Sequence, residues 1–252
     1  IMISPSSTNP KFTDEGGDNV FRVIGRDDQQ GLIAGDYLAK NYSKKNIAII
    51  HDGDTYGLGL AEITKHVLNK HGVTEVLFDS YQPDQKDYWS TVTKLINKKV
   101  DVLYAGGYYE DIGIILRQAK KDLPNLRLFS GDSIATTQFL FIAGNAGVGT
   151  YFTFGTDVRQ NPEAEELVAM IRDEDLYEPE GYTLYCYGAV QAWAQAVKMT
   201  NSFKPEAVIK ALKTGTFNAV LGKIGFDEKG DVTGIRTFAW YVFDEEDYSL
   251  AK

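Results

Sequence analysis

The sequence predicts an α/β fold built on mostly parallel sheets, and three observations indicate it. Continuous apolar runs, of which residues 46–51 are the clearest, suit parallel strands covered on both faces. Stretches with apolar residues at helical spacing, such as Leu60, Ile63 and Val67, alternate with these runs. Glycine and aspartate clusters, as at residues 52–54, separate them. Strands that alternate with helices indicate β-α-β units.

The first part of the chain repeats this cycle several times. It opens with an apolar strand end that runs into a hydroxyl-rich loop, in which Pro5 and Pro10 exclude a helix. Strands are then expected at residues 21–24, 46–51, 73–78, 100–104, 126–129 and 149–154. Helices are expected at residues 29–41, 56–71, 88–96 and 108–121, and from the turn at 130–133 toward 142.

The later part of the chain has a different pattern. Helices are expected at residues 162–171 and 183–199, and another begins near Pro205, because proline is tolerated in a first helical turn. Residues 217–226 and 237–243 are expected to be strands joined by a hairpin-type turn at 227–231.

Composition excludes several classes of function. The 252 residues carry a net charge of −9, which argues against a nucleic acid partner and against binding to an anionic membrane surface. No apolar run approaches the roughly 18 residues of a membrane span. The single cysteine, Cys186, excludes an internal disulfide and a multi-thiolate metal site, and we expect it to be a buried free thiol.

The motifs of catalysis and cofactor binding are absent from the sequence. There is no phosphate-binding loop and no nucleophile elbow of the G-x-S-x-G type. Gly57 and Gly59 begin a dinucleotide fingerprint, but Glu62 occupies the position of its third glycine. His66 and His71 are five residues apart and do not share a helix face as zinc ligands would. We therefore expect no metal, no cofactor and no catalytic residues.

The residues that follow the strands carry the functional signal. In parallel α/β sheets, ligands bind beyond the carboxyl ends of the strands. Ser6 and Thr8, Tyr56, Tyr108 and Asp132 follow successive strands. Each alone would be read as a helix cap or a turn residue. Together they could hold a zwitterion, with Asp132 facing an ammonium group and the serine–threonine loop facing a carboxylate.

At these residues the chain resembles the solute-binding proteins of branched-chain amino acid ABC transporters, which have the type I periplasmic-binding fold. The matching segments run in order along nearly the whole chain. They are residues 3–10, 21–31, 47–52, 56–61, 104–108, 116–119, 142–146 and 226–231.

The resemblance implies two doubly wound α/β lobes joined by a hinge that closes on the ligand. Lobe 1 would comprise residues 1–26 and 156–236, and lobe 2 residues 27–155 and 237–252. In the family, lobe 1 begins with about three β-α units before the segment that opens this chain. At about 30 residues per unit, roughly 90 residues of lobe 1 are expected to be missing. An incomplete lobe 1 invites self-association or pairing with a complementing N-terminal fragment.

The resemblance also implies the ligand contacts. Ser6 and Thr8 would bind the α-amino-acid end through backbone groups and the Thr8 hydroxyl. Tyr56 would close over the ligand, with Tyr108 at the same rim, and Asp132 would take the ammonium group. Tyr182 would line the pocket for the ligand's side chain.

The implied function is that of a non-enzymatic, extracytoplasmic component of an amino acid ABC transporter. It would bind a neutral amino acid in the cleft between the lobes. Small neutral ligands or γ-aminobutyric acid (GABA) rank first and branched-chain ligands second. The expected partner is the transporter permease. The expected location is the periplasm, or the outside of a Gram-positive cell with a lipid anchor, and no signal peptide is present in this chain. The alternatives are a ligand-sensing domain that regulates a partner protein and, with less support, an α/β enzyme.

Overall fold

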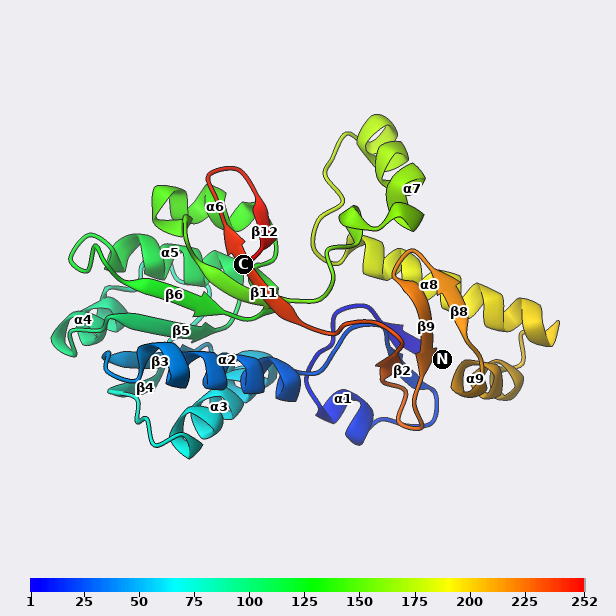
Figure 1. The fold of residues 1–252 in the computed structure, drawn as a ribbon, viewed down its shortest axis with the longest axis horizontal. Coiled ribbons are helices and arrows are strands. Elements are labelled where there is room, and N and C mark those ends of the chain that lie inside the picture. Colours follow the sequence, from blue (N-terminus) through cyan, green and yellow to red (C-terminus); the bar gives the residue numbers. More distant parts are fainter. Residues whose placement is uncertain (252) are drawn as a thin grey trace. The chain divides into compact units, whose positions relative to one another are not determined.

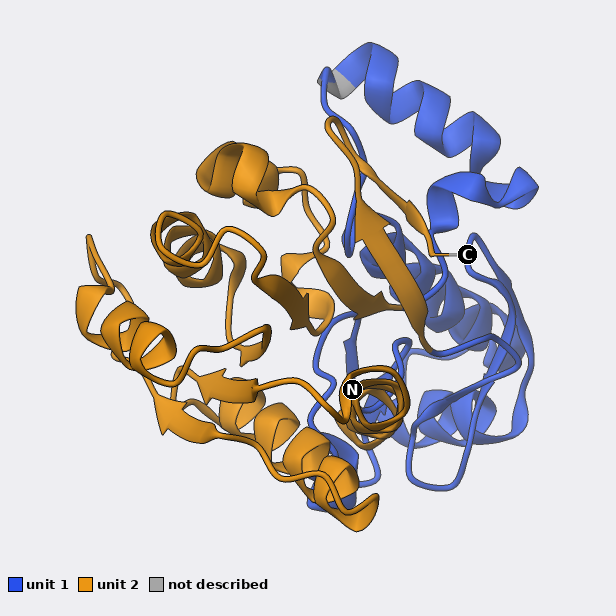
Figure 2. Cartoon of the chain, turned by 60° about the vertical axis from the view of Figure 1, so that its left-hand side comes forward, with its two compact units in different colours: residues 1–26, 155–237 blue, residues 27–154, 238–252 orange. Residues whose placement is uncertain are grey.

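The computed structural model of the chain describes residues 1–251, apart from the side chain of residue 175. The chain divides into two compact units, coloured separately in Figure 2. Unit 1 contains residues 1–26 and 155–237, and unit 2 contains residues 27–154 and those from 238 onward. The chain therefore passes from one unit to the other at three points.

Unit 2 is built on a seven-stranded sheet with the strand order β12-β11-β7-β6-β5-β3-β4. Its strands β3 to β7 are mutually parallel, and β11 and β12 are antiparallel to their neighbours. The strands are β3 Ile47–His51, β4 Leu77–Ser80, β5 Val102–Gly106, β6 Arg127–Ser130, β7 Tyr151–Phe154, β11 Ala239–Phe243 and β12 Tyr248–Leu250. β3 and β5 are buried along their whole length, which agrees with their continuous apolar sequences.

Helices cover both faces of this sheet. They are α2 Asp27–Tyr42, α3 Thr55–Lys70, α4 Trp89–Asn97, α5 Tyr109–Ala119 and α6 Gln138–Ala143. In Figure 1, α2 and α3 lie together on one face, and α5 and α6 lie on the other. Short helical turns, η1 Asp132–Ile134 and η2 Gly144–Gly147, flank α6. The predicted α/β class with a largely parallel sheet is confirmed.

The strand order reverses next to β3. The chain runs from β3 to its neighbour β4 on one side and then returns to β5 on the other side. The loops that leave β3 and β5 therefore diverge at the carboxyl edge of the sheet. Such a reversal is where open α/β sheets bind ligands.

Unit 1 contains smaller sheets. β1 Met2–Ser4 pairs in parallel with β2 Val20–Arg22, and β8 Phe217–Ala219, β9 Gly222–Phe226 and β10 Val232–Thr233 form an antiparallel set. The helices are α1 Lys11–Asp14, α7 Glu165–Met170, α8 Thr183–Thr200 and α9 Pro205–Thr214. Three short turns precede α8, namely η3 Val158–Gln160, η4 Pro162–Ala164 and η5 Ile171–Asp175.

The predicted strand at residues 217–226 is wrong in its extent. The segment folds back on itself as the hairpin β8–β9, and Gly222 supplies the positive φ of 103° next to the turn. The turn at 227–231 then leads from β9 into β10, whereas the expected partner strand, β11, pairs with β7 in unit 2. Local turn chemistry signals a hairpin but does not identify which strands it joins.

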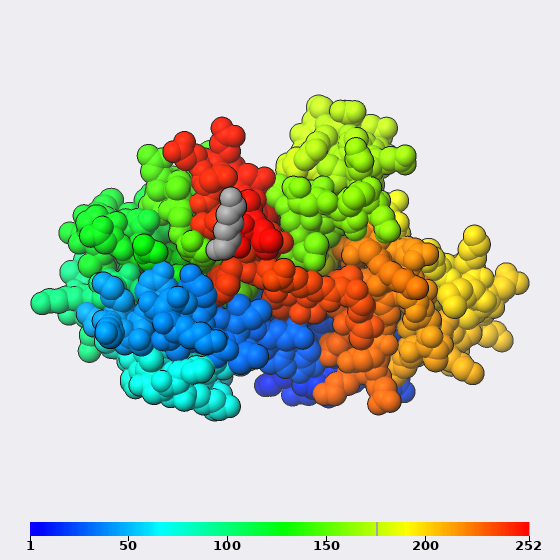
Figure 3. Space-filling view, in the orientation of Figure 1, coloured from blue at the N-terminus to red at the C-terminus, as the bar shows by residue number. Residues whose placement is uncertain are grey.

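Three further expectations need correction. β4 lies at Leu77–Ser80 rather than 73–78, and its polar residues are tolerated because it is an edge strand. β12 was not expected, and it forms the opposite edge; its red atoms are visible at the surface in Figure 3. Cys186 is exposed rather than buried, because the buried side of α8 is formed by residues such as Leu184, Tyr185 and Ala189.

The close approach of α3 to β5 depends on Gly106. A Cβ added there would lie 2.2 Å from the carbonyl oxygen of Gly57 on α3. We expect Gly106→Ala to lower the free energy of unfolding of unit 2 by about 1–3 kcal/mol, because backbone atoms must move. Urea denaturation measures this. Gly17→Ala is the control, since its Cβ approaches only the flexible end of Asn19; equal midpoints for the two variants would contradict the prediction.

Candidate functional site

In unit 2, the structure brings together three of the residues predicted from the sequence. Tyr56 lies in the first turn of α3, Tyr108 immediately precedes α5, and Asp132 begins the short turn η1 after β6. The Tyr56 hydroxyl donates to Asp132 Oδ1 over 2.8 Å. The rings of Tyr56 and Tyr108 are 5.6 Å apart. The carboxyl edge of the sheet thus places the Asp132 carboxylate beside two phenols, as the positions of these residues after their strands predict.

Asp132 is only 2% exposed and belongs to a buried polar network. Gln30 Nε2 donates to Asp132 Oδ1 over 2.6 Å and to Asp27 Oδ1 over 3.0 Å. Gln30 Oε1 accepts a hydrogen bond of 2.5 Å from Thr153 on β7. Asp27 and Gln30 are fully buried in the first turn of α2. One amide group therefore joins two buried carboxyl groups.

Asp27 and Gln30 are not among the site residues predicted from the sequence. A signal was nevertheless present, because both residues lie at helical spacing from Ala34 and Leu38 on the buried side of α2. Polar residues that continue an apolar stripe need buried hydrogen-bond partners. Finding those partners requires the tertiary structure.

Burial shifts the pKa values of Asp132 and Tyr56 upward. Burial raises the pKa of Asp132 to about 6, although the hydrogen bonds from Gln30 and Tyr56 oppose the change. Burial, together with the nearby Asp132 charge, raises the pKa of Tyr56 well above its usual value. Tyr56 is therefore a hydrogen-bond donor at neutral pH, and Asp132 is a carboxylate held in a place where a cationic partner would stabilise it.

In unit 1, the loop after β1 contains the predicted Ser6 and Thr8. The Ser4 hydroxyl organises this loop, because it accepts hydrogen bonds from the backbone N–H groups of Ser6 and Ser7 over 3.3 and 2.9 Å. Ser6 is exposed, whereas Thr8 is only 2% exposed. Thr8 Oγ1 makes no hydrogen bond within the part of the chain that the structure describes. A buried hydroxyl without a partner is costly, so Thr8 is a candidate contact for a bound group.

Arg22 holds the same loop from behind. Its side chain is fully buried, and its guanidinium donates to the carbonyl oxygens of Ser7 and Asn9 over 2.6 and 3.0 Å. It also donates to Thr13 Oγ1 over 2.7 Å, and its Nε lies 2.7 Å from Asp231 Oδ1. Arg22 is not among the site residues predicted from the sequence, although a charged residue within the apolar run at 21–24 is a visible signal.

Tyr182 lies just before the first residue of α8 in unit 1. Its ring is 6.1 Å from that of Tyr185, whose hydroxyl donates to the carbonyl oxygen of Thr156 over 2.9 Å. The six predicted residues thus divide between the units: Tyr56, Tyr108 and Asp132 belong to unit 2, and Ser6, Thr8 and Tyr182 belong to unit 1.

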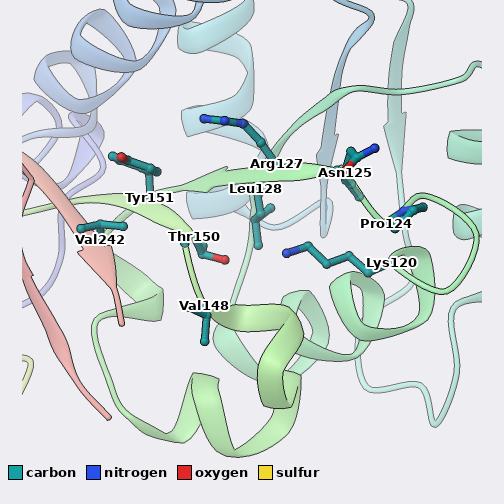
Figure 4. Close-up of a pocket in the computed structure, with 11 residues that line it drawn as sticks. Lys120, Pro124, Asn125, Arg127, Leu128, Val148, Thr150, Tyr151 and Val242 are labelled. Atoms are coloured by element: carbon teal, nitrogen blue, oxygen red, sulfur yellow. The ribbon is translucent and has the colours of Figure 1, made fainter. Parts of the chain in front are cut away.

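A hollow of about 340 Å³ lies elsewhere in unit 2, at the amino ends of β6 and β7 (Figure 4). Its described lining residues include Lys120 and Arg127 and no carboxylate. The Lys120 ammonium group already donates to the carbonyl oxygen of Ala146 over 2.8 Å. This hollow is at the opposite edge of the sheet from Asp132 and does not contain any of the predicted site residues.

The described residues contain no group of three or more His, Cys, Asp or Glu side chains that could hold a metal ion. None of the helices within residues 1–251 is long and apolar enough to cross a membrane.

Comparison with known sequences gives consistent matches. A family model described as periplasmic binding protein matches residues 1–246. The "Leu/Ile/Val-binding protein homolog 1" of Brucella suis is 44% identical over 243 residues, which cover 95% of this chain and 65% of that protein. The "Amino acid binding protein" of Pseudomonas aeruginosa is 38% identical and covers 98% of this chain and 66% of that protein. The chain therefore spans a little under two thirds of the length of these relatives.

Solved structures share the fold. A leucine binding protein from Thermotoga maritima superposes with a TM-score of 0.88 at 24% identity, covering 100% of this chain and 72% of that one. A branched-chain amino acid transporter substrate binding protein from Streptococcus pneumoniae, in complex with isoleucine, gives 0.82 at 22% identity, covering 99% and 72%. At this level of identity the likeness shows the fold alone.

Proposed function

The chain belongs to the periplasmic binding protein family, and from this premise we propose that it binds a neutral amino acid for an ABC transporter. The family and the relatives described above are binding proteins rather than enzymes. The proposed location is extracytoplasmic, and the proposed partner is a transporter permease. The names of the Brucella and Pseudomonas relatives support an amino acid as the ligand class.

The observation that carries the proposal is the buried carboxylate Asp132 beside Tyr56 and Tyr108. We propose that Asp132 binds the ammonium group of the ligand, because an opposite charge would offset the cost of burying this carboxylate. The two tyrosine rings would pack against the ligand. Tyr56 would also act as the residue that closes over it.

The unit 1 group is proposed to bind the other end of the ligand. Backbone N–H groups near Ser6 and the buried Thr8 hydroxyl suit a carboxylate, which accepts hydrogen bonds. Tyr182 would line the side-chain pocket. We rank small neutral amino acids and GABA first, because Tyr108 and Tyr182 would narrow the pocket, and branched-chain amino acids second.

Calorimetric titration with the twenty standard amino acids and GABA tests the proposed ligand class. We expect at least one neutral amino acid to bind, and acidic amino acids to bind much more weakly because of the charge of Asp132. Absence of binding by every ligand at millimolar concentration would refute the proposed function. Uptake of the bound amino acid by cells that lack the gene, compared with the parent strain, tests the transporter role separately.

Tyr56→Phe removes the hydroxyl that donates to Asp132 and keeps the ring beside Tyr108. We expect affinity for the bound amino acid to fall about 10-fold, since a hydrogen bond to a charged group contributes about 1.5–3 kcal/mol and water replaces part of it. Tyr56→Ala should in addition speed ligand release, which stopped-flow fluorescence measures. Tyr109→Phe, at the start of α5, is the control, and an equal effect there would count against a specific role for Tyr56.

A further inference from the structure

The hydrogen-bond network around Asp132 includes a second buried carboxyl group, that of Asp27, besides the side chain of Gln30. Gln30 has a single amide nitrogen, and that nitrogen donates to carboxyl oxygens of both Asp132 and Asp27. Its oxygen is fixed in turn by Thr153 from β7. Gln30 therefore has one orientation, because the amide must present its nitrogen to the two carboxyl groups and its oxygen to the hydroxyl.

We propose that Gln30 and Asp27 are positioning residues that set the orientation and the charge of Asp132 for binding the ligand's ammonium group. This inference rests on the proposed function, because it assigns these two residues to the ammonium end of that site. Gln30 fixes Asp132 Oδ1 and stabilises its ionised form. Asp27 accepts a hydrogen bond from the same Gln30 nitrogen over 3.0 Å, so its carboxyl group lies close to that of Asp132. When both carboxyl groups are ionised, Asp27 attracts the ammonium group and opposes the ionisation of Asp132.

The phenols around Asp132 do not change charge between pH 5 and 8. They are Tyr56 on α3, Tyr104 on β5 and Tyr108 before α5. Burial raises the pKa of each of these three phenols, so all remain neutral between pH 5 and 8. Asp132, whose pKa burial raises to about 6, is therefore the group of this cluster whose protonation is expected to couple to ligand binding over that range.

The two positioning residues have opposite expected effects on pH dependence. In the wild type, affinity should fall as the pH decreases through about 6, because a protonated Asp132 cannot pair with an ammonium group. Gln30→Leu removes a hydrogen-bond donor to the ionised Asp132 carboxylate and so raises the pKa of Asp132. The pH at which ligand affinity falls should therefore be higher than in the wild type. Asp27→Asn removes a like charge and so lowers the pKa of Asp132. The pH at which ligand affinity falls should therefore be lower than in the wild type.

The test is calorimetric titration of the protein from pH 5 to 8 with L-alanine, L-leucine and GABA, using whichever the wild type binds most tightly. Gln30→Leu should weaken binding about 10- to 100-fold at pH 8. Asp27→Asn should weaken it about 3- to 10-fold. The matched control is Gln118→Leu, since Gln118 is also buried in unit 2 and accepts a hydrogen bond of 2.8 Å from the Tyr88 backbone N–H. Its affinity and pH midpoint should equal those of the wild type.

A second measurement does not depend on the ligand. Carbon-13 NMR of labelled aspartate side chains in the ligand-free protein follows the Asp132 carboxyl directly. The midpoint of its titration should move upward in Gln30→Leu and downward in Asp27→Asn. Unmoved midpoints in both variants, or equal losses of affinity in Gln30→Leu and Gln118→Leu, would overturn the inference. If Gln30→Leu fails to fold, the isosteric Asp27→Asn decides alone. Failure of the wild type to bind any neutral amino acid would instead refute the proposed function.

Discussion

Replacing Asp132 by alanine is expected to weaken amino acid binding by roughly 2–5 kcal/mol, the range for removing one partner of a buried charge pair. The carboxylate is 2% exposed, so water cannot take over its role toward the ligand's ammonium group. Calorimetry at pH 8, where Asp132 is ionised, measures the loss. The exposed residue Asp54, which precedes α3 near the same edge, provides the control, and Asp54→Ala should bind normally.

Without ligand, the free energy of unfolding of Asp132→Ala should not be lower than that of the wild type. The pKa of Asp132 is raised to about 6 in the folded protein, so its ionised form destabilises the fold by roughly 3 kcal/mol at neutral pH. Because the folded pKa lies above the unfolded value, this penalty disappears as the pH falls from about 6 to about 4. Removing Asp132 therefore removes a cost, which is offset by a small cavity and by the loss of the acceptor for the Tyr56 hydroxyl, so the net change in stability should be small. A large loss of thermal stability together with unchanged affinity would exclude Asp132 from the binding site.

Replacing Arg22 by methionine is expected to lower the free energy of unfolding by about 3–5 kcal/mol. The guanidinium is fully buried, and its removal leaves the carbonyl oxygens of Ser7 and Asn9 without this donor. Asp231 loses one of its two arginine partners and keeps Arg26 and Thr13. Urea denaturation measures the change, and hydrogen exchange in residues 4–10 should show that the loop opens first. Ligand affinity should fall as well, because these carbonyl groups frame Thr8.

Lys213→Ala is the control variant for Arg22→Met. Lys213 pairs with the exposed Asp18 over 2.9 Å, also within unit 1, so its loss should leave the unfolding midpoint unchanged. An Arg22→Met protein with the wild-type midpoint would show that burial of this ion pair does not stabilise unit 1. Normal hydrogen exchange in residues 4–10 would show separately that Arg22 does not hold the loop.

Most of the secondary structure could be predicted from local patterns. The apolar runs and helical stripes of unit 2 correspond to observed strands and helices, with boundaries displaced by a few residues. The errors occur where local signals do not identify the partner. β9 pairs with β8 and β10, and β11 pairs with β7, although the sequence reads as one hairpin from 217 to 243. Strand pairing is a long-range property, and a turn motif fixes only its own geometry.

The sequence by itself determined the α/β class and three of the candidate contacts, Tyr56, Tyr108 and Asp132. These could be found because the carboxyl ends of parallel strands meet at one edge of a sheet, so their position in the chain predicts their position in space. Only the tertiary structure decided how the contacts are supported. Gln30 lies 102 positions from Asp132, and Thr13, which joins Arg22 to Asp231, lies 218 positions from that aspartate. Buried polar groups take partners from whatever element packs against them, and that packing follows from the whole fold rather than from local sequence.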